Sequence, residues 1–166
     1  MSTATVVNID THEQEALSDG EQRAWRGLLR AHACLAKRLD AQLEALHRLP
    51  MTSYEVLHCL AESPGARMRM RDLAEQAQLS RSGLTRLVDR LERDGLLERC
   101  SCSHDARGAY ACLTDEGRVR LGEARATHRA VVREQFFAHF SEPELGLLAD
   151  MWDRIAPCSN GARSHL

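Results

Sequence analysis

The sequence predicts a mainly α-helical, α+β protein in which two short helices are followed by a small β-hairpin. Apolar residues recur at helical spacing through most of the 166 residues, and only 4% of them are aromatic, as expected of helices packed through leucine and alanine. Residues 96–102 and 109–114 read as two short strands around the polar tip 103–108. A chain of this length and 43% hydrophobic composition is expected to bury one core, and hence to form one domain.

The two helices before the hairpin carry the clearest pattern. The first has Met70, Leu73, Ala74 and Ala77 at the one-face spacing of an amphipathic helix. Ser80 is a good N-cap residue for the second helix, and Gly95 is placed as its C-cap glycine. One side of the second helix is apolar, with Leu84, Leu87, Val88 and Leu91. The opposite side is polar, with Ser82, Thr85, Arg86, Asp89 and Arg93.

Two helices joined by a short turn are typical of the helix-turn-helix unit, whose second helix enters the DNA major groove. A hairpin that directly follows is a wing, and Arg107 at its tip is placed to enter a narrow minor groove. We expect the second helix to present Arg81, Ser82, Thr85 and Arg86 to the major groove, where an arginine can bind O6 and N7 of a guanine. Ser82 and Arg90 are expected to hold phosphates. The alternative is an ordinary solvated helix face.

The run D-L-A-E-Q-A-Q-L-S-R-S-G-L-T-R-L-V-D-R-L-E-R-D-G-L-L-E-R, followed by D-A-R-G-A-Y-A-C-L-T-D-E-G, resembles the multiple-antibiotic-resistance regulators, the MarR family. The wing pattern Asp105-x-Arg107, followed by Leu113-Thr114, is its most specific part, and the resemblance covers residues 20–157. It implies a winged helix-turn-helix transcriptional regulator, commonly a repressor, that works as a two-fold homodimer. It also implies that Asp105 orients an arginine, either Arg107 or one nearer the base of the hairpin.

The chain divides, on this reading, into a domain at 20–157 between tails at 1–19 and 158–166, which we expect to be mobile. Within the domain, 52–117 is the DNA-binding lobe, and the helical regions 20–47 and 115–157 are the dimerisation helices. Capping boxes are predicted to begin helices at Thr52 and Ser141. Thr114 is predicted to cap a helix that runs to about His139. A short strand at Arg67–Arg69 is expected to join the wing sheet.

The first and last helices are more apolar than one small lobe needs. They either complete a monomeric core or interlock with a second subunit. A dimer places two reading helices on one duplex, which raises affinity through effective concentration. We therefore expect a homodimer on a pseudo-palindromic double-stranded DNA operator with half-sites about 34 Å apart. The wings are expected to lie in the flanking minor grooves.

Whole-chain charge gives no support to DNA binding, because the formal net charge is −2. The basic residues are instead concentrated locally, at Arg81, Arg86, Arg90, Arg93, Arg99 and Arg107. The first 20 residues lack the pattern of a signal peptide, and no apolar run approaches the roughly 18 residues of a membrane span. We therefore expect a cytoplasmic, nucleoid-associated protein with no membrane partner.

MarR-like regulators usually bind a small, often phenolic or anionic, aromatic effector between the dimer helices and the DNA-reading lobe. The residues that could line such a pocket here are Trp25, Leu29 and His32 on the first helix, and His58 or Cys59 on the second. Ordinary core packing is the alternative, above all for Trp25 and Leu29. The pattern does not specify a particular ligand.

Six cysteines are scattered along the chain, and most are expected to be ordinary core or surface residues in a reducing compartment. The alternative is a thiol-based control of the wing through Cys100, Cys102 and Cys112. If the hairpin pairs symmetrically about Ala106, Cys100 and Cys112 lie opposite each other within disulfide reach.

Enzyme and metal chemistry are not indicated by the sequence. No nucleophile lies in a recognisable elbow and no glycine-rich loop follows a strand, so we expect no catalytic site and no cofactor. His128 and His139 are too far apart on one helix to form a metal-binding pair, and we expect no metal site. A non-switching architectural protein remains an alternative, and it would bind unrelated sequences with similar affinity.

Overall fold

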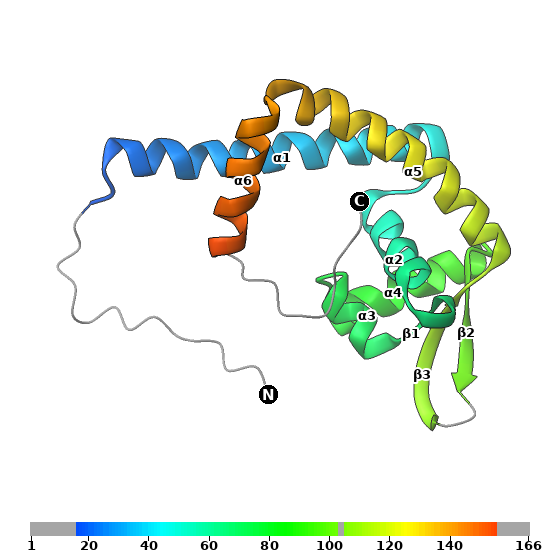
Figure 1. Cartoon of the computed structure of the whole chain (residues 1–166). Helices are drawn as coiled ribbons and strands as arrows, with labels where there is room; N and C mark the ends of the chain where they lie inside the picture. The colour runs from blue at the N-terminus through cyan, green and yellow to red at the C-terminus, as the bar shows by residue number, and fades with distance from the viewer. Residues whose placement is uncertain (1–15, 103–104, 156–166) are drawn as a thin grey trace, which may run out of the picture. The chain divides into compact units, whose positions relative to one another are not determined.

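The structure is a computed structural model that describes residues 16–102 and 105–155, with the backbone alone at 101–102 and 105–108. The chain forms two compact units that divide between Cys34 and Leu35. The elements in chain order are α1 (Asp19–His47), α2 (Met51–Glu62), the 3-10 helix η1 (Pro64–Ala66), β1 (Arg67–Arg69), α3 (Met70–Gln76), α4 (Arg81–Arg93), β2 (Leu97–Cys102), β3 (Asp105–Leu113), α5 (Asp115–Gln135), the 3-10 helix η2 (Phe137–His139) and α6 (Glu142–Ile155) (Figure 1). The predicted fold class, mainly helical with a small antiparallel sheet, is confirmed. The predicted tails lie almost wholly outside the described residues.

The sheet has three antiparallel strands in the order β1-β3-β2. The predicted strand at Arg67–Arg69 is present, and it pairs with β3 so that Arg67 lies opposite Cys112 and Arg69 opposite Tyr110. The two long strands β2 and β3 form the hairpin that projects from the helices (Figure 1). Both predicted features of the wing, its hairpin and its third strand, are therefore confirmed.

The register of the hairpin differs from the predicted symmetry about Ala106. Cys100 lies opposite Tyr110, not Cys112, and Glu98 lies opposite Cys112. The strand β3 begins at Asp105, four residues earlier than predicted, so Ala106 is inside the strand. Beyond Cys100 the register changes again, at an irregularity between Cys100 and Cys102, so that Cys102 lies opposite Asp105. A hairpin register depends on the turn geometry, which the polar tip left undefined.

One core joins α2, α3, α4, the sheet and the start of α5. Apolar faces with the predicted helical spacing supply most of it, and its fully buried large side chains are Leu43, Leu49, Leu57, Leu60, Leu73, Leu84, Leu91, Leu97, Leu121, Val56 and Val88. Ser53 on α2 is the one buried polar residue among those described. These elements thus form a packed body from which α4 and the wing present their outer faces.

Three predicted helix caps are confirmed. Gly83 donates its backbone N–H to Ser80 Oγ at 3.1 Å, and Gly117 donates to Thr114 Oγ1 at 3.0 Å. At the start of α6, the backbone N–H and hydroxyl of Ser141 both donate to Glu144 Oε2 at 2.7 Å, as in a capping box. These caps satisfy helix N-terminal groups that would otherwise lack partners.

Two predicted helix limits were wrong. Helix α2 begins at Met51, directly after Pro50, so Thr52 lies inside the helix and the cap is not a side chain of the 52–55 box. The N–H of Met51 instead donates to Asp40 Oδ1 of α1 at 2.8 Å. Helix α5 ends at Gln135, because Phe136 leaves the helical region with φ −127°, and residues 137–139 form a separate 3-10 turn.

Apolar side chains stay exposed on α1 and on α6. On α6 they are Leu147, Met151, Trp152 and Ile155, and this helix has no buried residue. On α1 they are Trp25, Leu28, Leu29 and Leu46. In the part of the chain that the structure describes, every helix is too short or too polar to cross a membrane.

The start of α5 is held against the end of α4. Thr114 donates its N–H to Leu96 O at 3.3 Å and its hydroxyl to Gly95 O at 2.7 Å. Three residues on, a Cβ placed on Gly117 would lie 1.9 Å from Leu96 O. Only glycine fits this approach without moving a backbone.

We predict that Gly117→Ala lowers the free energy of unfolding by roughly 1–3 kcal/mol, because the added methyl forces α5 away from Leu96. Gly122→Ala is the matched control on the same helix, since a Cβ there meets nothing within 4 Å. The control is expected to stabilise the protein by up to about 1 kcal/mol. Chemical denaturation of both variants measures the difference, and equal stabilities would contradict the close approach.

Candidate nucleic-acid interface

The outer face of α4 is exposed along its N-terminal half. Its inner face is buried through Leu84, Leu87, Val88 and Leu91. Residues 81–88 contain Arg81 and Arg86 and no acidic residue, so this half is positively charged. The helix N-terminus adds partial positive charge in the same place. An anion such as a phosphate would meet favourable charge here.

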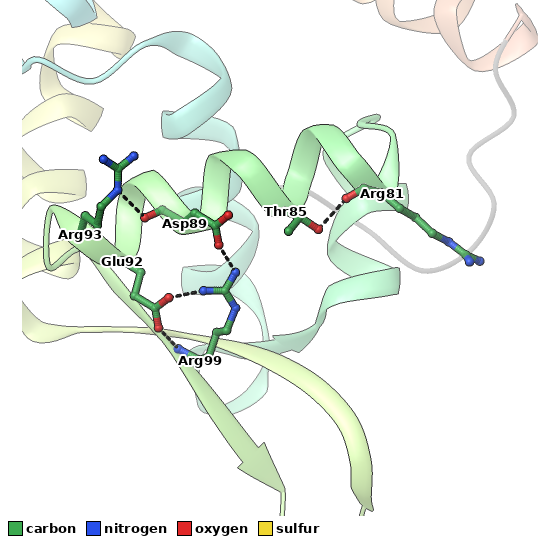
Figure 2. Close-up of polar contacts among 6 residues, drawn as sticks. All are labelled: Arg81, Thr85, Asp89, Glu92, Arg93 and Arg99. Carbon is green, nitrogen blue, oxygen red and sulfur yellow. Dashed lines mark hydrogen bonds and ion pairs between the residues drawn. The ribbon is translucent and has the colours of Figure 1, made fainter.

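The predicted major-groove residues lie together on this face. Arg81, Ser82, Thr85 and Arg86 are all exposed. Thr85 Oγ1 donates to Arg81 O at 2.9 Å, and Arg81 extends away from the helix (Figure 2). Ser82 Oγ lies 3.4 Å from the hydroxyl of the capping residue Ser80. The structure therefore brings the four side chains to one accessible surface.

Arg90, which we predicted to hold a phosphate, makes a contact inside the lobe. Its Nη2 donates to Ser53 Oγ at 2.9 Å, across 37 residues of sequence. Ser53 is 1% exposed, so this bond gives the buried hydroxyl its partner. One end of Arg90 thus ties α4 to α2.

The predicted wing residues lie on β3, which contains both Asp105 and Arg107. The structure describes only their backbone, so the proposed minor-groove role of Arg107 and the orienting role of Asp105 concern side chains outside the described part.

A hollow of about 420 Å³ lies among the N-terminal half of α4, the start of α3 and the strands β1 and β3. Three arginines line it, Arg69, Arg71 and Arg81, together with Met70, Leu84, Thr85 and Ala109. Arg69 Nε donates to the Tyr110 hydroxyl at 2.7 Å, and Arg71 Nε lies 3.3 Å from Asp72 Oδ1. Arg69 and Arg71 were not among the predicted site residues. Their position at the junction of the predicted strand and the predicted first helix was the available signal.

A second cluster ties the C-terminal half of α4 to the wing. The Arg99 guanidinium on β2 pairs with the carboxylates of Asp89 and Glu92, both on α4 (Figure 2). The backbone N–H of Arg99 also donates to Glu92 Oε1 at 3.1 Å. The hydrogen bond to Asp89 and the two negative charges raise the pKa of Arg99 above its ordinary value. The acidic residues of α4 are therefore neutralised within the protein.

The wing carries a disulfide between Cys100 and Cys112, with a Cα–Cα distance of 6.2 Å. These residues are diagonal neighbours, because Cys100 lies opposite Tyr110 and Cys112 opposite Glu98. The predicted reach between the two sulfurs is thus confirmed although the predicted register was wrong. Cys34 is a free, exposed cysteine and Cys59 a free, half-buried one, whereas the Cys102 side chain and Cys158 lie outside the described part.

A separate cavity of about 560 Å³ lies between α2 and α5. It contains one predicted effector-pocket residue, His58, and is otherwise lined by Met51, Tyr54, Glu55, Glu62, Arg125, His128, Arg129, Val132, Arg133 and Phe137. Of the other predicted residues, Trp25, Leu29 and His32 belong to the first unit, where they are exposed on α1, and Cys59 packs against the core. The cavity is both aromatic and basic, and α5, which supplies its arginines, was missed as part of this pocket.

The ring of Tyr54 is stacked with both histidines of this cavity. Its centroid is 5.9 Å from that of His58 and 4.9 Å from that of His128. Burial lowers the pKa of His58, and the nearby Arg125 lowers it further. Burial also lowers the pKa of His128, with a contribution from His58. Within the described residues, no group of three or more His, Cys, Asp or Glu side chains is arranged to hold a metal ion.

A two-helix unit with an exposed, basic second helix and an adjoining three-stranded wing defines the winged helix class of DNA-binding proteins. Comparison with known proteins agrees. The MarR family model matches residues 48–108. The homoprotocatechuate degradative operon repressor of Escherichia coli is 30% identical over 120 residues, which are 72% of this chain and 79% of that protein. The chain belongs to the MarR family, whose members are transcriptional regulators, not enzymes.

Two solved structures from Streptomyces coelicolor extend the similarity to nearly the whole chain. AbsC, a MarR family transcriptional regulator, is 36% identical with a TM-score of 0.81, over 86% of this chain and 96% of that one. Sco3205, a MarR family regulator solved in complex with DNA, is 34% identical with a TM-score of 0.80, over 92% and 97%. The winged helix fold of this chain is therefore one that binds DNA in a similar protein.

Proposed function

We propose that this protein is a sequence-specific transcriptional repressor that acts at the nucleoid and binds a pseudo-palindromic operator as a homodimer. The observation that carries the proposal is the exposed N-terminal half of α4, where Arg81, Ser82, Thr85 and Arg86 lie together in a stretch, residues 81–88, that contains no acidic residue. Arg81 and Arg86 are proposed to bind guanines, and Thr85 to offer its methyl group to a thymine. Arg107 on the wing is proposed to enter the flanking minor groove.

The proposed dimer is supported by the apolar surface that one chain leaves exposed. Trp152 and Ile155 of α6 are 40% and 72% exposed, and Trp25 of α1 is 55% exposed. Side chains of this size are typical of the buried centre of a stable interface. A two-fold dimer would set two copies of α4 about one turn of DNA apart.

DNA binding is tested with the full-length protein and an operator selected from random duplexes. We expect Arg86→Ala to weaken operator binding roughly tenfold or more and to relax base preference at one position in each half-site, because a bidentate arginine–guanine contact is lost. Arg93→Ala is the matched control, since the Nε of this exposed arginine is held by Asp89 O at 3.2 Å. Fluorescence anisotropy measures the dissociation constants.

The same measurement in a salt series tests the phosphate contacts. The logarithm of the binding constant should fall steeply with the logarithm of salt concentration, by about 0.9 for each phosphate contacted. A flat salt dependence, or equal affinity for unrelated duplexes, would overturn the sequence-specific proposal and favour an architectural protein.

We further propose that a small aromatic anion, bound in the cavity between α2 and α5, releases the operator. The stacked rings of Tyr54, His58 and His128 offer aromatic surface, and Arg125, Arg129 and Arg133 supply positive charge. Arg125 already contacts His58 Nδ1 at 3.0 Å and pairs with Glu62. Arg129 is therefore the proposed partner of the ligand carboxylate. The Escherichia coli relative, named for an operon that degrades an aromatic acid, supports this ligand class.

Homoprotocatechuate and benzoate are suitable probes for this effector site. Saturating probe is expected to weaken operator binding, and Arg129→Gln should raise the probe concentration needed about tenfold, because a charge-assisted hydrogen bond is removed. Arg118→Gln, on the exposed first turn of the same helix, is the matched control. If neither probe binds by calorimetry, the proposed ligand class is wrong.

The disulfide favours a second candidate function, a redox-responsive regulator. In a reducing cytoplasm Cys100 and Cys112 are expected to be thiols. Hydrogen peroxide would oxidise one thiol to a sulfenic acid and release one water. The second thiol would then displace another water as the sulfur–sulfur bond forms, so that one peroxide consumes two thiols and yields two waters. The disulfide found between them supports this reaction.

Treatment of the reduced protein with one equivalent of hydrogen peroxide tests this candidate. We expect loss of two thiols and weaker operator binding, because a cross-link between β2 and β3 restricts how the wing follows a groove. Cys112→Ser should abolish both effects, whereas Cys34→Ser should leave them intact. Unchanged operator affinity in the cross-linked protein, verified by mass, would remove the redox function.

A further inference from the structure

Arg99 joins two elements that have separate tasks in the proposed DNA complex. It lies on β2 of the wing, and its guanidinium reaches two carboxylates of α4 (Figure 2). Nη1 pairs with Glu92 Oε2 and Nη2 pairs with Asp89 Oδ1. Its backbone N–H adds a third contact, to Glu92 Oε1 at 3.1 Å. A single residue thus holds two consecutive turns of α4 to the wing.

The contact of Arg99 with Asp89 and Glu92 depends on the side-chain spacing along the helix α4 and along the strand β2. Asp89 and Glu92 are three residues apart, so they lie on one edge of α4. On β2, Arg99 shares its sheet face with the buried Ala111 opposite it, whereas the neighbouring Cys100 belongs to the other face. The planar fork of an arginine can bond to both carboxylates at once, which a lysine ammonium on a flexible stem does less well.

The pairing occupies the C-terminal half of α4, away from the half proposed to read bases. Arg81 and Arg86 are at the other end of the helix, and Arg107 is on the other strand of the hairpin. For α4 to reach the major groove and the wing to reach the minor groove of one duplex, the angle between α4 and the wing has to be fixed. Among the side chains that the structure describes, Arg99 bridges these two elements through its ion pairs with Asp89 and Glu92.

We propose that Arg99 is a positioning residue that sets the angle between the recognition helix and the wing, and that it does not contact DNA itself. The inference rests on the proposed DNA binding by α4 and the wing. It differs from the expectation that Arg99 belongs to the basic surface of this lobe. Asp89 and Glu92 become part of the DNA-binding device although both carry the charge that DNA repels.

The two roles for Arg99 predict opposite effects of removing the carboxylates. If Arg99 binds a phosphate, the double substitution Asp89→Asn with Glu92→Gln removes two repulsive charges and frees the guanidinium, so operator binding tightens. If Arg99 positions the wing, the same substitution releases β2 from α4, so operator binding weakens. The amides keep the size of the carboxylates, which limits effects on packing.

The experiment measures operator affinity by anisotropy for the wild type, Arg99→Gln, Arg99→Lys, the double amide variant and the variant that combines Arg99→Gln with both amides. We expect Arg99→Gln and the double amide variant each to weaken operator binding about tenfold. The combined variant should bind the operator no more weakly than either, because all three variants remove the same interaction. Arg99→Lys should restore only part of the loss. Thermal denaturation verifies that each protein is folded at the assay temperature.

A shortened operator separates positioning from a loss of folded protein. Removing the outer base pairs that the wing reaches should lower the operator affinity of the wild type. The same change should lower the affinity of Arg99→Gln and of the double amide variant much less. A smaller folded fraction would weaken binding to both duplexes by the same factor. Tighter or unchanged binding by the double amide variant, or an unchanged ratio between the duplexes, would overturn the role of Arg99. Absence of wild-type binding to any duplex would overturn the proposed function itself.

Discussion

Burial of one face of α4 decides how the DNA-reading lobe is arranged. Leu84, Leu87, Val88 and Leu91 are at most 8% exposed, so the rotation of the helix about its axis is fixed by the core. The helical period then sends Arg81 and Arg86 to the solvent side. Turning the helix by one residue, about 100°, would bury charged groups and expose leucines, and both changes are unfavourable. The exposed basic surface is therefore a consequence of ordinary apolar packing, because the buried leucines determine which way the arginines point.

Most of the fold could be predicted from the sequence because its signals are local. The caps at Ser80, Thr114 and Ser141 each depend on residues within one turn of the helix start, and all three were recognised. The capping box at Thr52 failed for a reason that is also physical. Pro50 already fixes the chain direction, and Asp40 of the preceding helix satisfies the Met51 N–H, so no local cap is required.

The candidate site was predictable only in outline. Sequence periodicity assigns a residue to a face, but it does not say which distant partner a long side chain finds. Arg90 and Ser53 are 37 residues apart, and nothing local marks their hydrogen bond. Arg99 belongs to the basic cluster by sequence, but the hairpin places its guanidinium against Asp89 and Glu92. The predicted proximity of Cys100 and Cys112 assumed a register that the tip residues do not define. In the structure the two cysteines are bonded as diagonal neighbours and not as opposite residues.

Gly117 allows the backbone of α5 to pack directly against the backbone of Leu96. The helix backbone there lies against Leu96 O, and Thr114 bonds to Leu96 O through its N–H and to Gly95 O through its hydroxyl. Sliding or separation of α5 would break these contacts, whereas a tilt about Leu96 disturbs them least. His128 lies eleven residues further along the same helix, a lever arm of roughly 16 Å at 1.5 Å per residue. A tilt of α5 about Leu96 would therefore move the helix much further at the aromatic cavity than at the base of the wing.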